Sequence, residues 1–244
     1  METVIIIQAR TGSSRFPKKI LESLYDSTVL ELVLDKCLKS KYADKVVLAV
    51  PDLEESKLIS DLVCNKSVNI FYGSENDVLS RYFECAKEHS AKHIVRVTSD
   101  CPLIDPSLID EMLEKYNKFA EEVYFANTCP PPSTFADGHD VEIFPFSYLQ
   151  QANEQEVDSD RREHVTFQFW QDDKYNSYQH KSDIDYSDIR LTVDYKDDLD
   201  NLRVLGDKFG KDRVKELSYK TICDYIIDNK LDKFLKPELR NKGW

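Results

Sequence analysis

The feature of this sequence that most constrains its fold is a series of short apolar runs that alternate with segments of helical periodicity. The runs are rich in β-branched residues, have the length of buried strands, and occupy residues 4–8, 45–50, 68–72 and 93–98. Helical patterns lie between and after them, at residues 28–40, 54–64, 77–90 and 107–119. This alternation predicts an α/β fold in which helices cover both faces of a mainly parallel sheet.

The second half of the chain is less regular. Residues 129–146 contain three consecutive prolines, an Asp-Gly pair and an alternating run, which predict a loop or arm followed by a strand. We expect helices at 147–156, 195–210 and 218–235, and a last strand at 188–194. A chain of 244 residues can bury one large core, so we predict a single domain over residues 1–244.

The loop that follows the first strand is unusual in an acidic chain. The formal net charge is -12, yet residues 9–19 contain no acid and four cations, which are Arg10, Arg15, Lys18 and Lys19. Gly12 permits a tight bend and close backbone approach, while Ser13 and Ser14 add hydroxyl and N–H donors. The loop matches neither a Walker motif nor a dinucleotide-binding motif, and a solvated basic turn is the alternative. Because ligands bind beyond the carboxyl ends of parallel strands, we predict a local phosphate site here.

Composition excludes several classes of function. A pI near 4.9 argues against a general nucleic-acid binder. No stretch approaches the ~20 apolar residues that span a bilayer, so we expect no membrane insertion. The six cysteines are scattered without a Cys-x-x-Cys pair, which argues against a zinc ribbon or a disulfide framework. We therefore expect a cytoplasmic protein with reduced thiols.

Two aspartates stand where apolar strands are predicted to end. Asp100 follows the run at 93–98, and Asp194 closes the run at 188–194. A carboxylate in that place can hold Mg²⁺ together with substrate phosphates, although Asp194 could instead cap the next helix. Asp105, before Pro106, is more simply a helix cap. Together with the cationic loop, the two aspartates predict a site for a nucleotide and Mg²⁺.

Other polar groups are weaker candidates. Arg81 follows a polar turn in which Asp77 could simply cap a helix, and His164 could be a general base, a ligand or an ordinary hydrogen-bonded histidine. Three Asp-x-Asp pairs occur, at 158/160, 183/185 and 198/200, but none directly follows a predicted buried strand. The metal-binding pair of a nucleotide-sugar glycosyltransferase is therefore missing from its usual place.

With these features the sequence resembles the cytidylyltransferases that activate acidic sugars, of the acylneuraminate and 3-deoxy-manno-octulosonate types. It is most similar to the branch named after the spore coat polysaccharide biosynthesis protein SpsF. The resemblance covers most of residues 4–205, through the ordered blocks IIIQARTGSSRFPKKIL, GSENDVLSRYFECAKEHSAKHIVRVTSDCPLIDPSLID, DGHDVEIFPFSYLQQA, REHVT and RLTVDYKDDL. One departure is Lys18, because a glycine often precedes the lysine of the loop in relatives.

The resemblance implies a fold, partners and site residues. The fold would be the Rossmann-like nucleotide-diphospho-sugar transferase fold, with a segment at about 128–185 that binds the acceptor and supports a homodimer. The nucleotide would lie against Ala9, Arg10, Gly12, Ser13, Arg15, Lys19, Asp77 and Arg81. Asp100 and Asp194 would be the magnesium carboxylates, with Arg15 and Lys19 as their catalytic partners. The acceptor would bind near Asp140, Glu142, Arg162, Glu163 and His164.

The implied reaction transfers CMP from CTP to an acidic sugar or a sugar or polyol phosphate, for surface polysaccharide or glycoconjugate synthesis. In that hypothesis an acceptor hydroxyl or phosphate attacks the α-phosphorus in line, and Arg15 and Lys19 bind the departing pyrophosphate. Three alternatives stay open. They are a sugar-1-phosphate nucleotidyltransferase that uses another NTP, a glycosyltransferase of the GT-A type, and a nucleotide-sensing protein without turnover.

Overall fold

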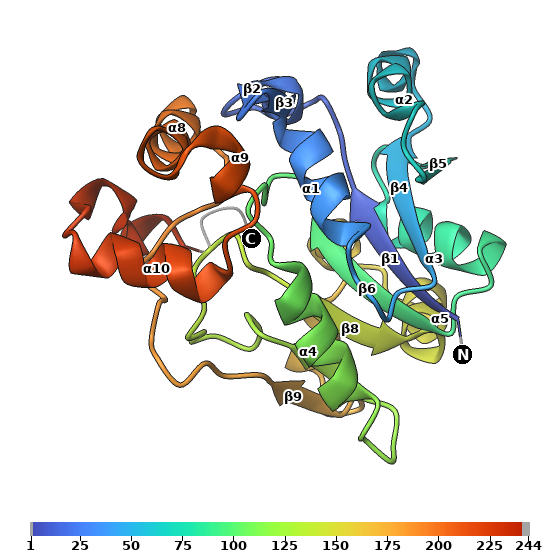
Figure 1. The fold of residues 1–244 in the computed structure, drawn as a ribbon. Helices are drawn as coiled ribbons and strands as arrows, with labels where there is room; N and C mark the ends of the chain where they lie inside the picture. The colour runs from blue at the N-terminus through green and yellow to red at the C-terminus, as the bar shows by residue number, and fades with distance from the viewer. Residues whose placement is uncertain (1, 241–244) are drawn as a thin grey trace.

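The computed structural model describes residues 2–240, which are built on a seven-stranded sheet of order β5-β4-β1-β6-β8-β7-β9 (Figure 1). Four neighbouring strands run parallel, namely β5 (Asn69–Gly73), β4 (Lys45–Pro51), β1 (Thr3–Gln8) and β6 (His93–Thr98). β8 (Glu142–Pro145) is antiparallel to both β6 and β7 (Tyr124–Ala126), and β9 (Ser177–Gln179) is parallel to β7. The predicted mixed, mainly parallel α/β fold is confirmed.

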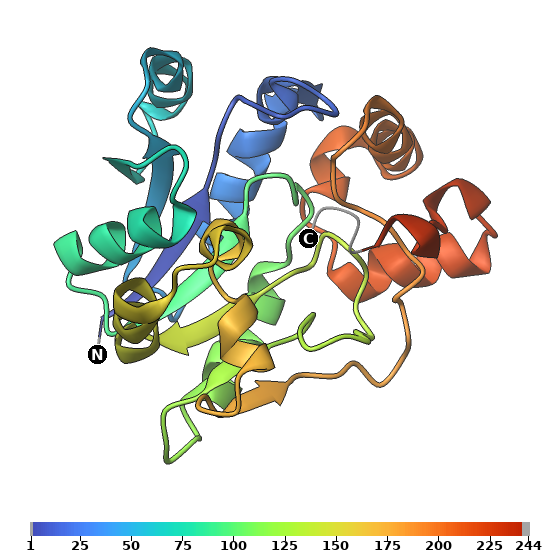
Figure 2. The same ribbon diagram turned by 180° about the vertical axis from the view of Figure 1, so that it is seen from behind.

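Helices cover both faces of this sheet, as the uninterrupted apolar strands require. In β1, Ile5 and Ile7 belong to one core, whereas Val4 and Ile6 belong to the other. The first core includes apolar residues of α1 (Val29–Cys37) and α4 (Pro106–Tyr116), and the second includes those of α3 (Val78–Glu88), α5 (Phe146–Gln155) and α7 (Phe167–Gln171) (Figures 1 and 2).

The predicted helix boundaries follow from local capping. Thr28 and Glu31 form a capping box at the start of α1, and Asp105 caps α4, with Pro106 in the first turn. Asp77 caps α3 by accepting a hydrogen bond from the Ser80 backbone N–H at 2.9 Å. The capping functions proposed for Asp77 and Asp105 are thus confirmed.

The C-terminal helices form a separate group beside α1 (Figure 1). They are α8 (Lys196–Phe209), α9 (Lys211–Val214) and α10 (Tyr219–Asp228), and their apolar residues join the first core. α8 ends at Gly210, whose φ of +86° suits glycine. The remaining short elements are the strands β2 (Ser23–Leu24) and β3 (Ser27–Thr28), the helices α2 (Lys57–Val63) and α6 (Ser159–His164), and the 3₁₀ turns η1 (Lys19–Leu21), η2 (Glu54–Ser56), η3 (Asp232–Phe234) and η4 (Pro237–Leu239).

The predicted strand at 188–194 is wrong. The segment is extended and largely buried, but its backbone bonds to loops instead of to a strand of the sheet. The N–H of Arg190 donates to the carbonyl of Phe234, that of Leu191 to Asp137, and that of Val193 to Asp100, at 2.8, 2.7 and 2.9 Å. Burial between loops produces the same apolar pattern as burial in a sheet, so periodicity could not separate the two.

One predicted helix boundary also changes in the structure. The helix predicted at 218–235 ends at Asp228, and η3 follows it. The segment at about 128–185 contributes β8 and β9 to the sheet, and α5 and α7 to the core of one face. A homodimer formed through it stays a prediction. No helix among residues 2–240 combines the length and the apolar character that crossing a membrane would need.

Candidate active site

A cavity of about 580 Å³ opens at the carboxyl ends of β1 and β6. All but two of the predicted site residues line it; the exceptions are Asp77 and Arg162. The cavity is also lined by polar residues that the sequence analysis did not single out, among them Arg96, Asp137 and Arg190. The predicted loop and strand ends thus meet around one space.

The loop after β1 folds around the carbonyl of Thr11. That carbonyl accepts hydrogen bonds from the backbone N–H groups of Ser13 and Lys18, at 3.1 and 3.0 Å. Gly12 is the central residue of the tight turn that the Ser13 N–H closes, as predicted, and a second turn falls on Lys18, which has a φ of +59°. A Cβ on Gly12 would meet no atom within 4 Å, so its open surroundings leave the backbone accessible at the cavity.

The conformation of Lys18 also explains the departure from relatives. Glycine adopts a positive φ at little cost, so a glycine before the lysine satisfies the same turn. The Lys18 side chain is exposed and does not line the cavity. Position 18 therefore requires a left-handed backbone conformation, and the charge of Lys18 has no contact with the cavity.

Asp100 and Asp194 come together across Lys19. The Lys19 ammonium lies 2.7 Å from Oδ2 of Asp100 and 2.8 Å from Oδ1 of Asp194. Burial alone would raise the pKa of Asp100, but the adjacent Lys19 overrides it and lowers that pKa to about 2. Burial also opposes the charge of Lys19, yet the two carboxylates raise its pKa above the ordinary value. Asp100 and Lys19 are therefore both charged at neutral pH.

The helix-capping alternative for Asp194 does not hold. Tyr195 is the N-cap of α8, and the Asp198 carboxylate accepts from the backbone N–H groups of Asp194 and Tyr195, each at 2.9 Å. The Asp194 carboxylate instead faces Lys19 and also Arg15, whose Nη2 lies 3.2 Å away. Its side chain is thus available at the cavity.

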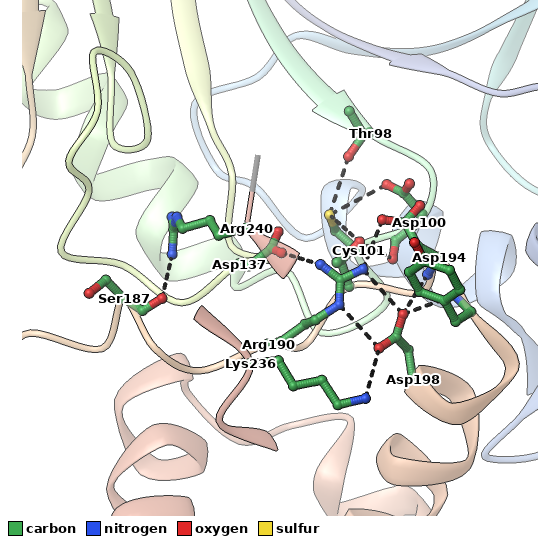
Figure 3. Close-up of polar contacts among 12 residues, drawn as sticks. Thr98, Asp100, Cys101, Asp137, Ser187, Arg190, Asp194, Asp198, Lys236 and Arg240 are labelled. Atoms are coloured by element: carbon green, nitrogen blue, oxygen red, sulfur yellow. Dashed lines mark hydrogen bonds and ion pairs between the residues drawn. The ribbon is translucent and has the colours of Figure 1, made fainter. Parts of the chain in front are cut away.

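Arg190 organises the acidic side of the cavity (Figure 3). Its side chain is only 4% exposed, and its guanidinium contacts three carboxylates. Nη2 lies 2.8 Å from Asp194, Nε lies 3.1 Å from Asp198, and Nη1 bonds to Asp137. A lone arginine inside the apolar run DIRLTV was the signal that sequence reasoning missed.

The loop from Asp137 to Glu142 supplies three further carboxylates. Gly138 has a φ of +107°, and a Cβ there would lie 2.7 Å from the Leu191 backbone, so only glycine lets the two segments approach. Glu142 is ion-paired with Arg96 and accepts from the Tyr124 hydroxyl at 2.9 Å. Burial raises the pKa of Asp137 to about 6 despite Arg190. Burial, followed by the charge of Asp137, raises the pKa of Asp140 to about 7.

The opposite side of the cavity carries cations. Arg81 is 2% exposed and donates from Nη1 to the carbonyl of Ser74 at 2.6 Å, while its buried Nε has no hydrogen-bond partner within the described chain. Arg10 pairs with Glu163 at 3.3 Å. A buried guanidinium beside a second arginine suits a ligand that offers oxygen or ring-nitrogen acceptors.

His164 lines the same side and stacks on Phe167, with ring centroids 4.4 Å apart. Burial, followed by the charge of Arg96, lowers its pKa below the ordinary value. The next residue, Val165, has a φ of +63°, which is strained for a β-branched side chain. His164 and Thr166 on either side of it both line the cavity, and the Thr166 N–H donates to the His164 carbonyl at 2.6 Å.

Asp77 and Arg162 pair with each other instead of lining the cavity. Nη2 of Arg162 lies 2.6 Å from Oδ2 of Asp77, and Nη1 donates to the carbonyl of Glu156 at 2.8 Å. The pair joins the start of α3 to α6. This ion pair therefore stabilises the contact between α3 and α6. The ligand contacts that the resemblance implies for Asp77 and Arg162 stay predictions.

The donor set fits magnesium. Mg²⁺ usually takes one or two protein carboxylates and completes its shell with water and substrate phosphates. Asp100 and Asp194 face one another across a single ammonium group beside the cationic loop. Among residues 2–240 no cluster of three or more acidic, His or Cys side chains could hold a metal by itself. Substrate oxygens would therefore have to complete such a site.

Comparison with known proteins adds independent information. The family model described as "Cytidylyltransferase" matches residues 4–226. An uncharacterised protein of Methanocaldococcus jannaschii is 31% identical over 247 residues, which covers 100% of this chain and 98% of the relative. The spore coat polysaccharide biosynthesis protein SpsF of Bacillus subtilis is 25% identical, covering 86% of this chain and 88% of SpsF.

A solved structure agrees with these matches. The structure of a cytidylyltransferase from Leptospira borgpetersenii superposes with a TM-score of 0.88 at 32% identity. The superposition covers 96% of this chain and 97% of that one. The similarity therefore extends over nearly all of both chains.

Proposed function

The chain belongs to the cytidylyltransferase family, and from this premise we propose that it transfers CMP from CTP to an acidic sugar, or to a sugar or polyol phosphate, with release of pyrophosphate. The observation that carries the proposal is the meeting of Lys19, Asp100 and Asp194 in a cavity lined by the cationic loop. Such transfer needs positioning and charge neutralisation more than covalent chemistry, and this cavity offers both.

Each side of the cavity has its own part in the proposal. Arg15 and Lys19 bind the departing pyrophosphate, and Arg81 with Arg10 holds the nucleotide. Ala9, Gly12 and Ser13 place backbone and hydroxyl groups along it. The acceptor binds on the side formed by Asp140, Glu142, Glu163 and His164.

Asp100 and Asp194 would hold Mg²⁺. Magnesium bound there would neutralise charge on the triphosphate and on the leaving group. The Lys19 ammonium lies between the two carboxylates and offsets their charge. Lys19 would have to turn partly toward the phosphates when a nucleotide enters.

The name of the relative SpsF supports a place in surface polysaccharide or glycoconjugate synthesis. A homodimer is proposed on the resemblance of the sequence, and light scattering of the purified protein would test it. A monomer across the working concentration range would refute it.

The test of the activity is pyrophosphate release with Mg²⁺, each of the four common NTPs, and a pool of sugar acids and sugar or polyol phosphates, with mass spectrometry of the products. We expect release to require CTP and to give a CMP-linked mass. Asp100→Asn should lower turnover by about 10²-fold or more, whereas Asp61→Asn, on the exposed side of α2, makes the same chemical change without effect. No CTP binding in calorimetry, or equal turnover in both variants, would contradict the proposal.

A further inference from the structure

The two oxygens of the Asp194 carboxylate have different neighbours. Oδ1 lies 2.8 Å from the Lys19 ammonium and 3.2 Å from Nη2 of Arg15, and both of these cations line the cavity. Oδ2 instead accepts a hydrogen bond from Nη2 of the buried Arg190 at 2.8 Å. A ligand that enters the cavity therefore meets Oδ1, because the Arg190 guanidinium already occupies Oδ2.

A second carboxylate fixes the orientation of Arg190. The buried side chain of Asp198 accepts from Nε of Arg190 at 3.1 Å and from Nη2 at 3.2 Å, so it holds one edge of the planar guanidinium with two bonds (Figure 3). The same carboxylate accepts from the backbone N–H groups of Asp194 and Tyr195. Asp198 therefore fixes the backbone of Asp194 directly and its side chain through Arg190.

The backbone of Arg190 is held on its other side by the C-terminal part of the chain. Its N–H donates to the carbonyl of Phe234 at 2.8 Å. Nη1 of Arg240 donates to the carbonyl of Ser187 at 2.9 Å, three positions before Arg190 (Figure 3). Both the backbone and the side chain of Arg190 are thus fixed by segments that lie outside the cavity.

Neutralisation of buried charge does not by itself explain this arrangement. Arg190 contacts three carboxylates, which is more negative charge than one guanidinium can neutralise. A buried ion pair is also weak evidence of stability, since desolvation offsets much of the attraction. A guanidinium can, however, orient several carboxylates at once, because its five donors have a fixed geometry. The contacts of Arg190 therefore fit a role in orientation better than a role in neutralisation.

We propose that Arg190 is a positioning residue, which holds Oδ2 of Asp194 and so directs Oδ1 alone toward a divalent cation in the cavity. The inference rests on the proposed cytidylyl transfer, in which Asp100 and Asp194 would hold Mg²⁺. Magnesium demands a near-ideal octahedral shell, so a carboxylate that is free to offer both oxygens suits it less well than one that is held to a single oxygen. Groups that orient a metal ligand typically change metal affinity or activity by about 10- to 100-fold.

The test measures how much Mg²⁺ strengthens the binding of α,β-methylene CTP, an analogue that cannot release pyrophosphate. Its dissociation constant is determined by calorimetry in Mg²⁺ and again in EDTA, for the wild-type chain and for Arg190→Lys. Lysine keeps the positive charge but loses the fixed set of donors. The matched control is Arg203→Lys, because Arg203 pairs with Asp200 on α8 and its side chain is 43% exposed.

We expect Arg190→Lys to reduce the Mg²⁺-dependent gain in affinity by about tenfold. The affinity in EDTA should stay within about twofold of the wild-type value, since Arg190 is proposed to act through Asp194 and not on the nucleotide. Arg203→Lys should change neither value. Asp198→Asn is measured beside them, because it removes one of the two oxygens that orient Arg190. We expect it to reduce the same gain by about tenfold, and it decides the question if Arg190→Lys does not fold.

Each other outcome has a defined meaning. A full Mg²⁺-dependent gain in Arg190→Lys, or in Asp198→Asn if only that variant folds, would overturn the positioning role. Equal weakening in Mg²⁺ and in EDTA would also overturn it, because the effect would then not depend on the cation. A wild-type chain that binds the analogue equally in Mg²⁺ and EDTA would overturn the inference and leave nucleotide binding intact. Failure of the wild-type chain to bind the analogue at all would instead remove the proposed function.

Discussion

Replacement of Asp140 by Asn should stabilise the ligand-free protein at neutral and alkaline pH. Burial, followed by the charges of Asp137, Glu142 and Asp100, raises the pKa of Asp140 from its ordinary 3.8 to about 7. One pKa unit corresponds to about 1.4 kcal/mol, so a fully buried, independent carboxylate would cost the fold about 4 kcal/mol. Asp140 is partly open to the cavity, and Asp137 shares the penalty. We therefore expect the substitution to raise the free energy of unfolding by about 2 kcal/mol.

The pH dependence follows from the direction of the pKa. Because the folded protein holds Asp140 at a higher pKa than the unfolded chain does, its ionisation destabilises the fold. The advantage of Asn is full above about pH 7, decreases as the pH falls through 7 toward 3.8, and disappears below that range. Asp140 thus lowers the stability of the fold while it lines the ligand cavity. Such a residue is expected where ligand binding requires a group that is unfavourable for folding.

Urea denaturation measures this effect directly. The wild-type chain, Asp140→Asn and Asp61→Asn are unfolded at pH 8 and pH 5 in EDTA, because a bound divalent cation would offset the carboxylates. We expect Asp140→Asn to have the highest midpoint at pH 8, with a smaller difference at pH 5. The reasoning is refuted if Asp140→Asn is no more stable than Asp61→Asn at pH 8, or if its advantage grows toward pH 5.

Three further predictions concern cations of the loop and the cavity. Lys19→Met should lower pyrophosphate release by about 10²-fold or more, because it removes the cation between Asp100 and Asp194. Lys18→Gly should change the rate of pyrophosphate release by less than about twofold, since glycine suits a φ of +59°. A large loss of that rate would show that the charge of Lys18 is needed. Arg96→Met should lower the free energy of unfolding by about 3–5 kcal/mol, because it leaves Glu142 buried without a cation. In urea titrations the double variant Arg96→Met/Glu142→Leu should regain part of that free energy, and additive losses would contradict the pairing.

Local patterns in the sequence predict much of the fold because they report which faces are buried. The apolar residues of the runs that became β1, β4 and β6 are buried, whereas β5 at the sheet edge buries Phe71 alone, and α1, α3 and α4 begin at capping residues that the sequence shows. The short strands β7 and β9 have only three residues each, too few for a period to appear. The cationic loop and the aspartates Asp100 and Asp194 were also visible, since they come after apolar runs, although only the first of these two runs is a strand.

Charge pairing could not be predicted in this way. Lys19 and Asp194 are 175 positions apart, and Arg190 meets Asp137 across 53 positions. Such contacts depend on sheet order and on the path of the connecting segments. Residues 188–194 illustrate this, because the same apolar run serves a strand or, as here, an extended segment held by loops.

The sequence alone therefore determined the layers of the fold and the kind of chemistry at one edge of the sheet, because both depend on residue type and short-range order. Only the tertiary structure decided which charges neutralise one another and which stay open to a ligand. Whether a carboxylate such as Asp140 is paired depends on the few ångströms around it, and those distances are set by packing between segments far apart in the chain.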